Sequence, residues 1–211
     1  MVVSKERVAE GEIASYEGLA DAKWQGRICT RSGKHAYNIA MVSMMMQHHG
    51  DAEAEAWLGG VKANLARKPQ GNDRAQVKAI HSGQCDIALI NHYYMYQMAN
   101  DEEQKPWHDA VRVVFPNQAD RGTHMNISGM AMTKHAPNAE NALKLMEFLA
   151  SDEAQKMYAD VNGEYPVNPD IPVSDYLSGL GAFKQDTLDL SAVADHRAEA
   201  SKIVDRVGYD D

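Results

Sequence analysis

Short apolar runs alternate with helix-like segments through the first half of this chain, and this alternation constrains the fold more than any other feature. Three runs have the length and composition of strands: residues 26–30, 85–90 and 111–115. Four segments between them carry apolar residues at helical spacing: residues 36–49, 51–67, 72–82 and 92–100. The pattern predicts an α/β fold, in which helices cover the faces of a sheet.

The remaining segments are less regular. Residues 4–25 are polar and show no clear period, whereas residues 124–133 are rich in small and β-favouring side chains and are expected to form a further strand. Apolar periodicity and capping residues predict three more helices: residues 139–150, 151–161 and 191–208.

Charge and hydropathy exclude some classes of function. The 211 residues suit one large domain or two small ones, and 21 basic against 30 acidic side chains give a net charge of −9. An acidic chain without a basic run is poorly suited to nucleic acid. No stretch approaches the ~18 apolar residues of a membrane-spanning helix. Met1–Glu6 lack the hydrophobic region of a signal peptide, so we expect any export signal to lie outside this sequence.

The two cysteines, Cys29 and Cys85, each adjoin an apolar β-like run. They could form a disulfide between neighbouring strands in an oxidising compartment, or remain buried free thiols. Neither cysteine belongs to a pair with zinc-binding spacing, which argues against a structural zinc site. The sequence leaves the redox state of the two thiols open.

Familiar catalytic motifs are absent from the sequence. We find no glycine-rich dinucleotide or P-loop signature, no HExxH helix and no GxSxG nucleophile. His48 and His49 are adjacent on a predicted helix and point about 100° apart, so they cannot chelate one ion together. His35, His92 and His124 lie at predicted turns or strand ends, where a contact with a ligand is a minor alternative. We therefore expect no enzyme.

Three tyrosines occupy equivalent places in the predicted fold. Tyr93 and Tyr94 follow the strand at 85–90, and Tyr37 follows the strand at 26–30. The carboxyl ends of such strands form the crevice where open α/β folds bind ligands. A hard cation such as Fe³⁺ prefers anionic oxygen donors, and a bound cation can displace the phenol proton despite a usual pKa near ~10. Ordinary packing with a hydrated hydroxyl remains the alternative on local sequence alone.

At these residues the sequence resembles the ferric-ion-binding periplasmic proteins of bacterial iron ABC transporters, which have a type II periplasmic-binding-protein fold. The resemblance runs nearly end to end and rests on seven segments: Tyr16–Asp21, Lys23–Ile28, Cys29–His35, Ala66–Asp73, Asn91–Tyr94, Asn126–Gly129 and Glu164–Asn168. It implies a mixed sheet flanked by helices, a ferric ion as cargo, a membrane permease as partner and a periplasmic location.

The resemblance also implies roles for individual residues. The paired tyrosine ligands of the family fall on Tyr93 and Tyr94, and the third tyrosine of one subgroup lies 56 positions earlier, on Tyr37. Members that bind iron together with an anion, such as carbonate or phosphate, hold that anion near these tyrosines. The matching anion-site positions here are Arg31, Ser32, Gly33 and Asn91, with Asn72 or Asp73 as looser candidates. The anion is optional in the three-tyrosine subgroup.

Family members have two lobes, and most of the N-terminal lobe has no counterpart in this sequence. The resemblance implies a discontinuous C-terminal lobe formed by residues 1–120 and 173–211, with residues 121–172 as a remnant of the N-terminal lobe. Alone, the remnant would expose an apolar face, which invites a homodimer.

Three alternatives to iron capture are open at this point. The same fold could bind another solute, such as an oxyanion, a polyamine or a sugar, or the chain could be a remnant that no longer binds iron. A tyrosine-ligated metal hydrolase or oxidase is the enzyme alternative, and it lacks a recognisable general base other than His92.

Overall fold

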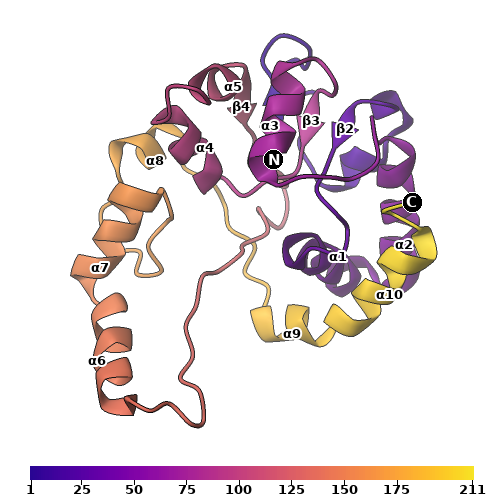
Figure 1. Cartoon of the computed structure of the whole chain (residues 1–211). Helices are drawn as coiled ribbons and strands as arrows, with labels where there is room; N and C mark the ends of the chain where they lie inside the picture. Colours follow the sequence, from indigo (N-terminus) through magenta and orange to yellow (C-terminus); the bar gives the residue numbers. More distant parts are fainter.

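A four-stranded mixed sheet lies at the centre of the computed structural model, which describes residues 1–211 (Figure 1). The strand order is β2-β3-β1-β4. The strands are β1 (Val2–Ser4), β2 (Ile28–Cys29), β3 (Ile87–Ala88) and β4 (Val111–Val113). β2 runs parallel to β3, whereas β1 is antiparallel to both of its neighbours. The predicted α/β fold with a mixed sheet is confirmed.

The central strand β1 was not predicted from the sequence. Val2 lies opposite both Ala88 and Val113, so this strand joins β3 to β4. Three residues are too few to show a period of two, and only the pairing partners on both sides make this segment a strand. The other strands fall within the predicted runs but are shorter than predicted.

The two faces of the sheet lead into two separate cores, because successive side chains of a strand point to opposite sides. Ile28 and Ile87 pack into the larger core, whereas Cys29 and Ala88 belong to the smaller one. The helices of the larger core are α1 (Ala36–His49), α2 (Asp51–Ala63), α9 (Leu190–Asp195) and α10 (Arg197–Val207). The helices on the other face are α3 (Asp73–His81), α4 (Tyr93–Ala99) and α5 (Lys105–Asp109).

Three predicted helices differ in extent from those in the structure. The helix predicted for residues 151–161 is divided into the α-helix Asp152–Met157 and the π-helix Tyr158–Asn162. The helix predicted for residues 51–67 ends at Ala63, where Asn64 caps it and donates its side-chain amide to Leu19 O and Asp21 O, each at 2.8 Å. The helix predicted for residues 191–208 is divided at His196 into α9 and α10. None of the helices combines the length and the hydrophobicity that a membrane-spanning helix requires.

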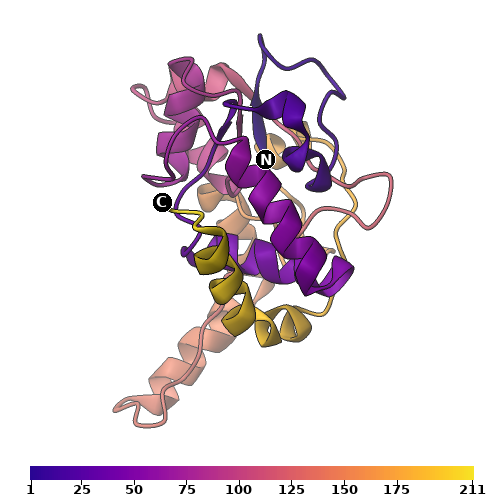
Figure 2. The same ribbon diagram turned by 90° about the vertical axis from the view of Figure 1, so that its right-hand side faces the viewer.

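Residues 124–182 leave this body as a long extension and return to it (Figure 1). The outgoing and returning segments meet at Thr123 and Gln185, where Thr123 N donates to Lys184 O and Asp186 N donates to Thr123 O, each at 2.9 Å. The extension carries α6 (Ala139–Leu149), α7 (Asp152–Met157), the π-helix η3 (Tyr158–Asn162) and α8 (Asp175–Gly179). Figure 2 shows α6 projecting away from the sheet and its helices.

The strand predicted for residues 124–133 is wrong. These residues are not in a strand and are mostly exposed, because no neighbouring strand pairs with them. The large apolar side chains that are exposed all lie between residues 127 and 173, and α6 buries none of its residues. An exposed apolar face on this part of the chain is therefore present, as predicted.

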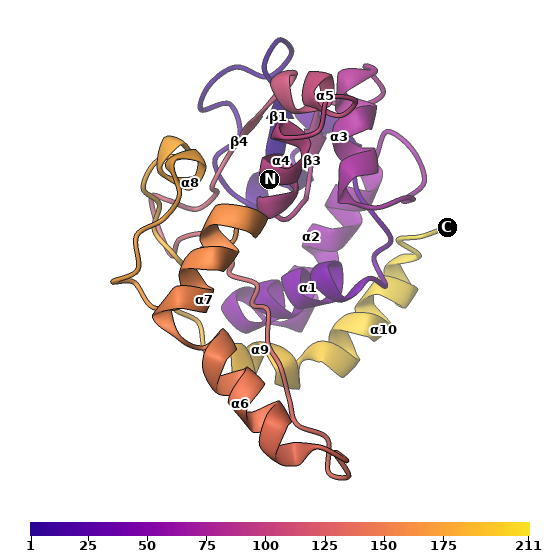
Figure 3. The same ribbon diagram turned by 60° about the vertical axis from the view of Figure 1, so that its left-hand side comes forward.

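Helix α4 contacts the extension through η3, and Figure 3 shows the upper end of the orange helix, beyond α7, next to α4. Tyr96 donates its hydroxyl to Asp160 O at 2.5 Å, and Gln97 donates to Asn162 Oδ1 at 3.0 Å. Gly163 has a φ of +70°, and a Cβ there would lie 2.5 Å from Tyr96 Cβ. A glycine is needed at this position for both reasons. These contacts lie two to three residues beyond the tyrosine pair that begins the same helix.

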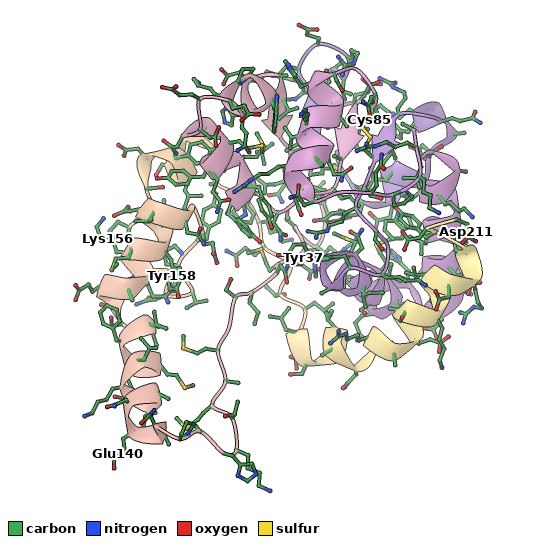
Figure 4. The ribbon with its side chains drawn as sticks, in the orientation of Figure 1. Tyr37, Cys85, Glu140, Lys156, Tyr158 and Asp211 are labelled. Atoms are coloured by element: carbon green, nitrogen blue, oxygen red, sulfur yellow. A yellow bond between two sulfur atoms is a disulfide. The ribbon has the colours of Figure 1, made fainter.

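Cys29 and Cys85 form a disulfide across a loop with a sequence separation of 56 residues. Both sulfur atoms lie in the smaller core, beneath α3 (Figure 4). Of the two states that the sequence leaves open, the structure shows the disulfide.

Replacing Cys29 and Cys85 together by alanine is expected to lower the free energy of unfolding by about 2–4 kcal/mol, because the open loop gains entropy in the unfolded chain. Urea unfolding of the oxidised protein and of the double variant measures the difference. Reductant should destabilise the wild-type chain and leave the double variant unchanged. Equal stability of all these forms would contradict the expectation.

Candidate functional site

The three predicted tyrosine ligands come together at the carboxyl ends of β2 and β3. Tyr37 lies in the first turn of α1, where His35 Nδ1 accepts a hydrogen bond from its backbone N–H at 3.2 Å. Tyr93 and Tyr94 begin α4. The hydroxyl oxygens of Tyr37 and Tyr93 are 3.0 Å apart, and the rings of Tyr93 and Tyr94 lie 4.6 Å apart. Figure 4 shows Tyr37 on the side of the body that faces the extension.

The environment of the pair keeps its phenols protonated in the absence of a cation. Burial raises the pKa of Tyr93 far above its usual range, and the hydrogen bond with Tyr37 adds to the shift. Burial also raises the pKa of Tyr94. A cation that binds these oxygens must therefore displace their protons, and only a strongly charged ion gains enough energy to do so.

A closed ring of polar contacts surrounds Tyr37 and Tyr93. Arg31 pairs with Asp73, and its guanidinium lies 5.1 Å from the centre of the Tyr37 ring. Asp73 Oδ1 accepts a hydrogen bond from the backbone N–H of Asn91 at 3.0 Å. Asn91 Nδ2 donates to the Tyr93 hydroxyl at 3.2 Å. The turn before α1, the start of α3 and the segment before α4 are thus tied together at the tyrosines.

The other predicted anion-binding residues, Ser32, Gly33 and Asn72, form hydrogen bonds with groups other than the tyrosines. Ser32 Oγ and Gly33 N both donate to the carboxylate of Asp210, at 2.7 Å and 2.9 Å, and neither residue lines the cavity at Tyr37. Asn72 is exposed and caps α3, where its side chain accepts a hydrogen bond from Ala75 N at 3.1 Å. The structure therefore places Arg31 and Asn91 in contact with the tyrosines, whereas Ser32, Gly33 and Asn72 do not line the cavity.

Two histidines near the cavity are uncharged at neutral pH. Burial lowers the pKa of His92 to about 4, and its Nε2 atom is buried without a hydrogen-bond partner. Burial likewise lowers the pKa of His124 to about 4. His48 and His49 bind different carboxylates, those of Asp186 and Glu17. As predicted, the adjacent histidines do not face one ligand.

Sequence reasoning missed one residue that shapes the site and named a second only as a looser candidate. Asn38 donates its side-chain amide to Arg31 O and Ser32 O, each at 3.0 Å, and so fixes the turn before α1. Asp73 was only a loose candidate, although its side chain is 1% exposed and binds two of the residues that hold the tyrosines. Its position directly after the capping Asn72 gave no signal, because acidic residues are common in the first turn of any helix.

A cavity of about 1030 Å³ opens between the body and the extension. Its body side includes Arg31, Tyr37, Asp73, Asn91 and Tyr93. Its far side is formed by two segments of the extension, residues 124–130 and 164–169. Tyr94 lies behind Tyr93, packed against the smaller core. No group of three or more His, Cys, Asp or Glu side chains could hold a metal ion elsewhere in the structure.

A sheet-and-helix body, an extension connected to it by two segments that meet side by side, and a cleft between body and extension are features of a solute-binding protein. The chain belongs to the family of bacterial extracellular solute-binding proteins, whose family model matches residues 1–178. The family predicted from the sequence is confirmed.

Several relatives are iron proteins. The chain is 41% identical to iron uptake protein A1 of Synechocystis over 211 residues, covering 99% of this chain and 59% of that protein. It is 28% identical to the major ferric iron-binding protein of Neisseria meningitidis over 203 residues, covering 96% of this chain and 59% of that protein. The chain thus spans about 59% of the length of these relatives.

Solved structures show the same fold. The apo ferric ion-binding protein A of Pasteurella haemolytica superposes with a TM-score of 0.96 at 45% identity, covering 100% of this chain and 66% of that one. A Trichodesmium protein in complex with iron and citrate ligands superposes with a TM-score of 0.93 at 41% identity, covering 99% of this chain and 66% of that one. The type II periplasmic-binding-protein fold predicted from the sequence is confirmed.

Proposed function

We propose that this chain captures a ferric ion for a bacterial iron-uptake transporter, with the phenolate oxygens of Tyr37, Tyr93 and Tyr94 as ligands. The observation that carries the proposal is the convergence of these phenols, with 3.0 Å between the hydroxyl oxygens of Tyr37 and Tyr93. Hard anionic oxygen is the ligand type that a small trivalent cation prefers. The printed functions of the relatives, iron uptake and ferric iron binding, support the same cargo.

The remaining parts of the proposal follow from the family. Residues 1–120 with 173–211 would form the C-terminal lobe, and residues 121–172 would belong to the N-terminal lobe. The loaded protein would deliver its ion to a membrane permease from the periplasm, and it would act by binding without catalysing a reaction. The homodimer predicted through the apolar face of residues 121–172 stays a prediction, since no observation here tests it.

Another solute remains the second candidate function, and Arg31 supports it. Its guanidinium lines the cavity and is 15% exposed, so it could contact an oxyanion. Asp73 already pairs with it, however, which makes a free oxyanion a weaker fit than a cation at the phenols. A thermal-shift screen with phosphate, polyamines and sugars separates this function from iron capture, because only a bound ligand raises the unfolding temperature.

Titration with ferric ion tests the proposal directly. We expect a visible phenolate-to-iron charge-transfer band that grows to one equivalent of iron. Tyr176→Phe is a matched control, because this tyrosine lies outside the cavity and its hydroxyl is hydrogen-bonded only to His108 Nε2, at 3.2 Å. The control should give the full band. A colourless wild-type chain would contradict the proposal.

A further inference from the structure

The groups that the sequence assigns to an external anion already have internal partners. Arg31 pairs with Asp73, and the Asn91 side chain donates to the Tyr93 hydroxyl. Ser32 and Gly33 both donate to Asp210 and do not line the cavity. At the tyrosines, therefore, the negative charge that faces the anion-site residues is the carboxylate of Asp73.

Helix capping does not explain why Asp73 is buried. Asn72 already caps α3, so Asp73 is free of that role. Burying a carboxylate is costly unless charged and hydrogen-bonding partners compensate for the lost water. At Asp73 the partners are the guanidinium of Arg31 and the backbone N–H of Asn91, and both belong to the ring around the tyrosines.

We propose that Asp73 is a built-in anion, which occupies the place of an external anion beside the tyrosines and positions Arg31 and Asn91 around them. The carboxylate of Asp73 bonds to Arg31 and to the backbone N–H of Asn91, and not to a phenol, so it is a positioning residue. Its effect on metal binding rests on the proposed ferric function, whereas its exclusion of anions from Arg31 does not.

The charge pattern gives the proposal its specificity. A guanidinium and a backbone N–H that converge on one point form a site for a small oxyanion such as phosphate or carbonate, because such ions accept several charge-assisted hydrogen bonds. The carboxylate of Asp73 neutralises the positive charge of Arg31 at this site. Without the negative charge of Asp73, Arg31 would have no counter-ion beside Tyr37. A dissolved anion could then bind to its guanidinium.

The first experiment needs no metal. We compare the unfolding temperature of the wild-type chain and of Asp73→Asn in phosphate and in bicarbonate. Asparagine keeps the volume and the hydrogen bond from Asn91 but removes the charge. We expect either anion to raise the unfolding temperature of Asp73→Asn by about 3 °C or more near saturation, and to leave the wild-type chain unchanged.

Two variants serve as controls. Asp73→Asn combined with Arg31→Gln removes the cation as well, and should lose the response to anions. Asp73→Glu keeps the charge, and should remain as insensitive to anions as the wild-type chain. Both variants lack the Asp73 carboxylate. A general loss of stability therefore cannot explain a difference between them in the response of the unfolding temperature to anions.

The second experiment follows the ferric charge-transfer band in buffer free of carbonate and phosphate, with air-oxidised ferrous chloride as the iron source. The wild-type band should form fully, and its maximum should not move when phosphate is added. The band of Asp73→Asn should require at least about 10-fold more iron without an anion, in the range seen for outer-shell changes at metal sites. Phosphate should restore the binding and shift the maximum.

The outcomes separate the two proposals. If the wild-type chain gives no band but Asp73→Asn is stabilised by anions, ferric capture fails and the built-in anion stands. If Asp73→Asn responds to anions in neither experiment, the built-in anion is overturned even when the wild-type chain binds iron. Should Asp73→Asn fail to fold, the wild-type chain decides: a band that needs phosphate or carbonate overturns the proposal, and a band that needs neither supports it.

Discussion

Replacing Tyr93 and Tyr94 together by phenylalanine is expected to abolish the ferric charge-transfer band. The double variant keeps both rings, so the packing of Tyr94 against the smaller core is retained and only the two oxygens are lost. Outer-shell changes at metal sites cost ~10–100-fold in affinity, and the loss of two direct ligands should exceed that range. Replacing Tyr37 alone should weaken binding less, because the adjacent pair remains.

Competition with a ferric chelator measures these affinities, and circular dichroism checks that the variants fold. Phenylalanine should leave the chain folded but cost about 1–3 kcal/mol of stability, because the hydrogen bonds of the Tyr93 hydroxyl with Tyr37 and Asn91 are lost. Tyr176→Phe, which also removes one tyrosine hydroxyl, should bind iron as the wild-type chain does. Undiminished colour in the variant that lacks both hydroxyls would exclude the pair as ligands.

Acidification is expected to weaken ferric binding steeply. The pKa values of Tyr93 and Tyr94 are raised by burial, so both phenols are protonated throughout the range below pH 10. Each phenol that becomes a ligand must therefore release its proton, and each proton released changes the affinity by ~10-fold per pH unit. Two or three ligand phenols would lower the affinity by about 100- to 1000-fold for each unit of acidification.

The measurement is a chelator competition at several pH values between about 5 and 8, corrected for the protonation of the chelator. The slope of log affinity against pH counts the protons that are released. Tyr37→Phe should reduce the slope by one if Tyr37 is a ligand. A slope near zero would mean that iron, where it binds, does not bind through phenolates.

Regular segments with a clear period were predictable from the sequence. The runs at 26–30, 85–90 and 111–115 each contain a strand, and the helix at 36–49 was predicted with its correct bounds. Strand β1 was missed because three residues have no measurable period, and the strand at 124–133 was predicted wrongly because β-favouring residues need a pairing partner. Nothing in the sequence of residues 191–208 indicated that the helix would be divided at His196.

The candidate site was predictable only in part. Tyr37, Tyr93 and Tyr94 follow predicted strands, and the type of fold brings such positions together. Asp73 was only a looser candidate and Asp210 was not predicted, because the side chains that they contact, Arg31 and Ser32, lie 42 and 178 residues away in the sequence. Contacts of that range depend on the pairing of β2 with β3 and on the packing of α10 against α1, which the sequence does not show.

Helix α4 both positions the tyrosine pair and contacts the extension. Its first residues present Tyr93 to the cleft and hold the Tyr94 ring beside it, and Tyr96 and Gln97 contact the backbone of Asp160 and the side chain of Asn162 in the extension. Because both sets of contacts lie within or beside one helix of seven residues, we expect a shift of the phenols on metal binding to alter the contacts of Tyr96 and Gln97 with the extension as well.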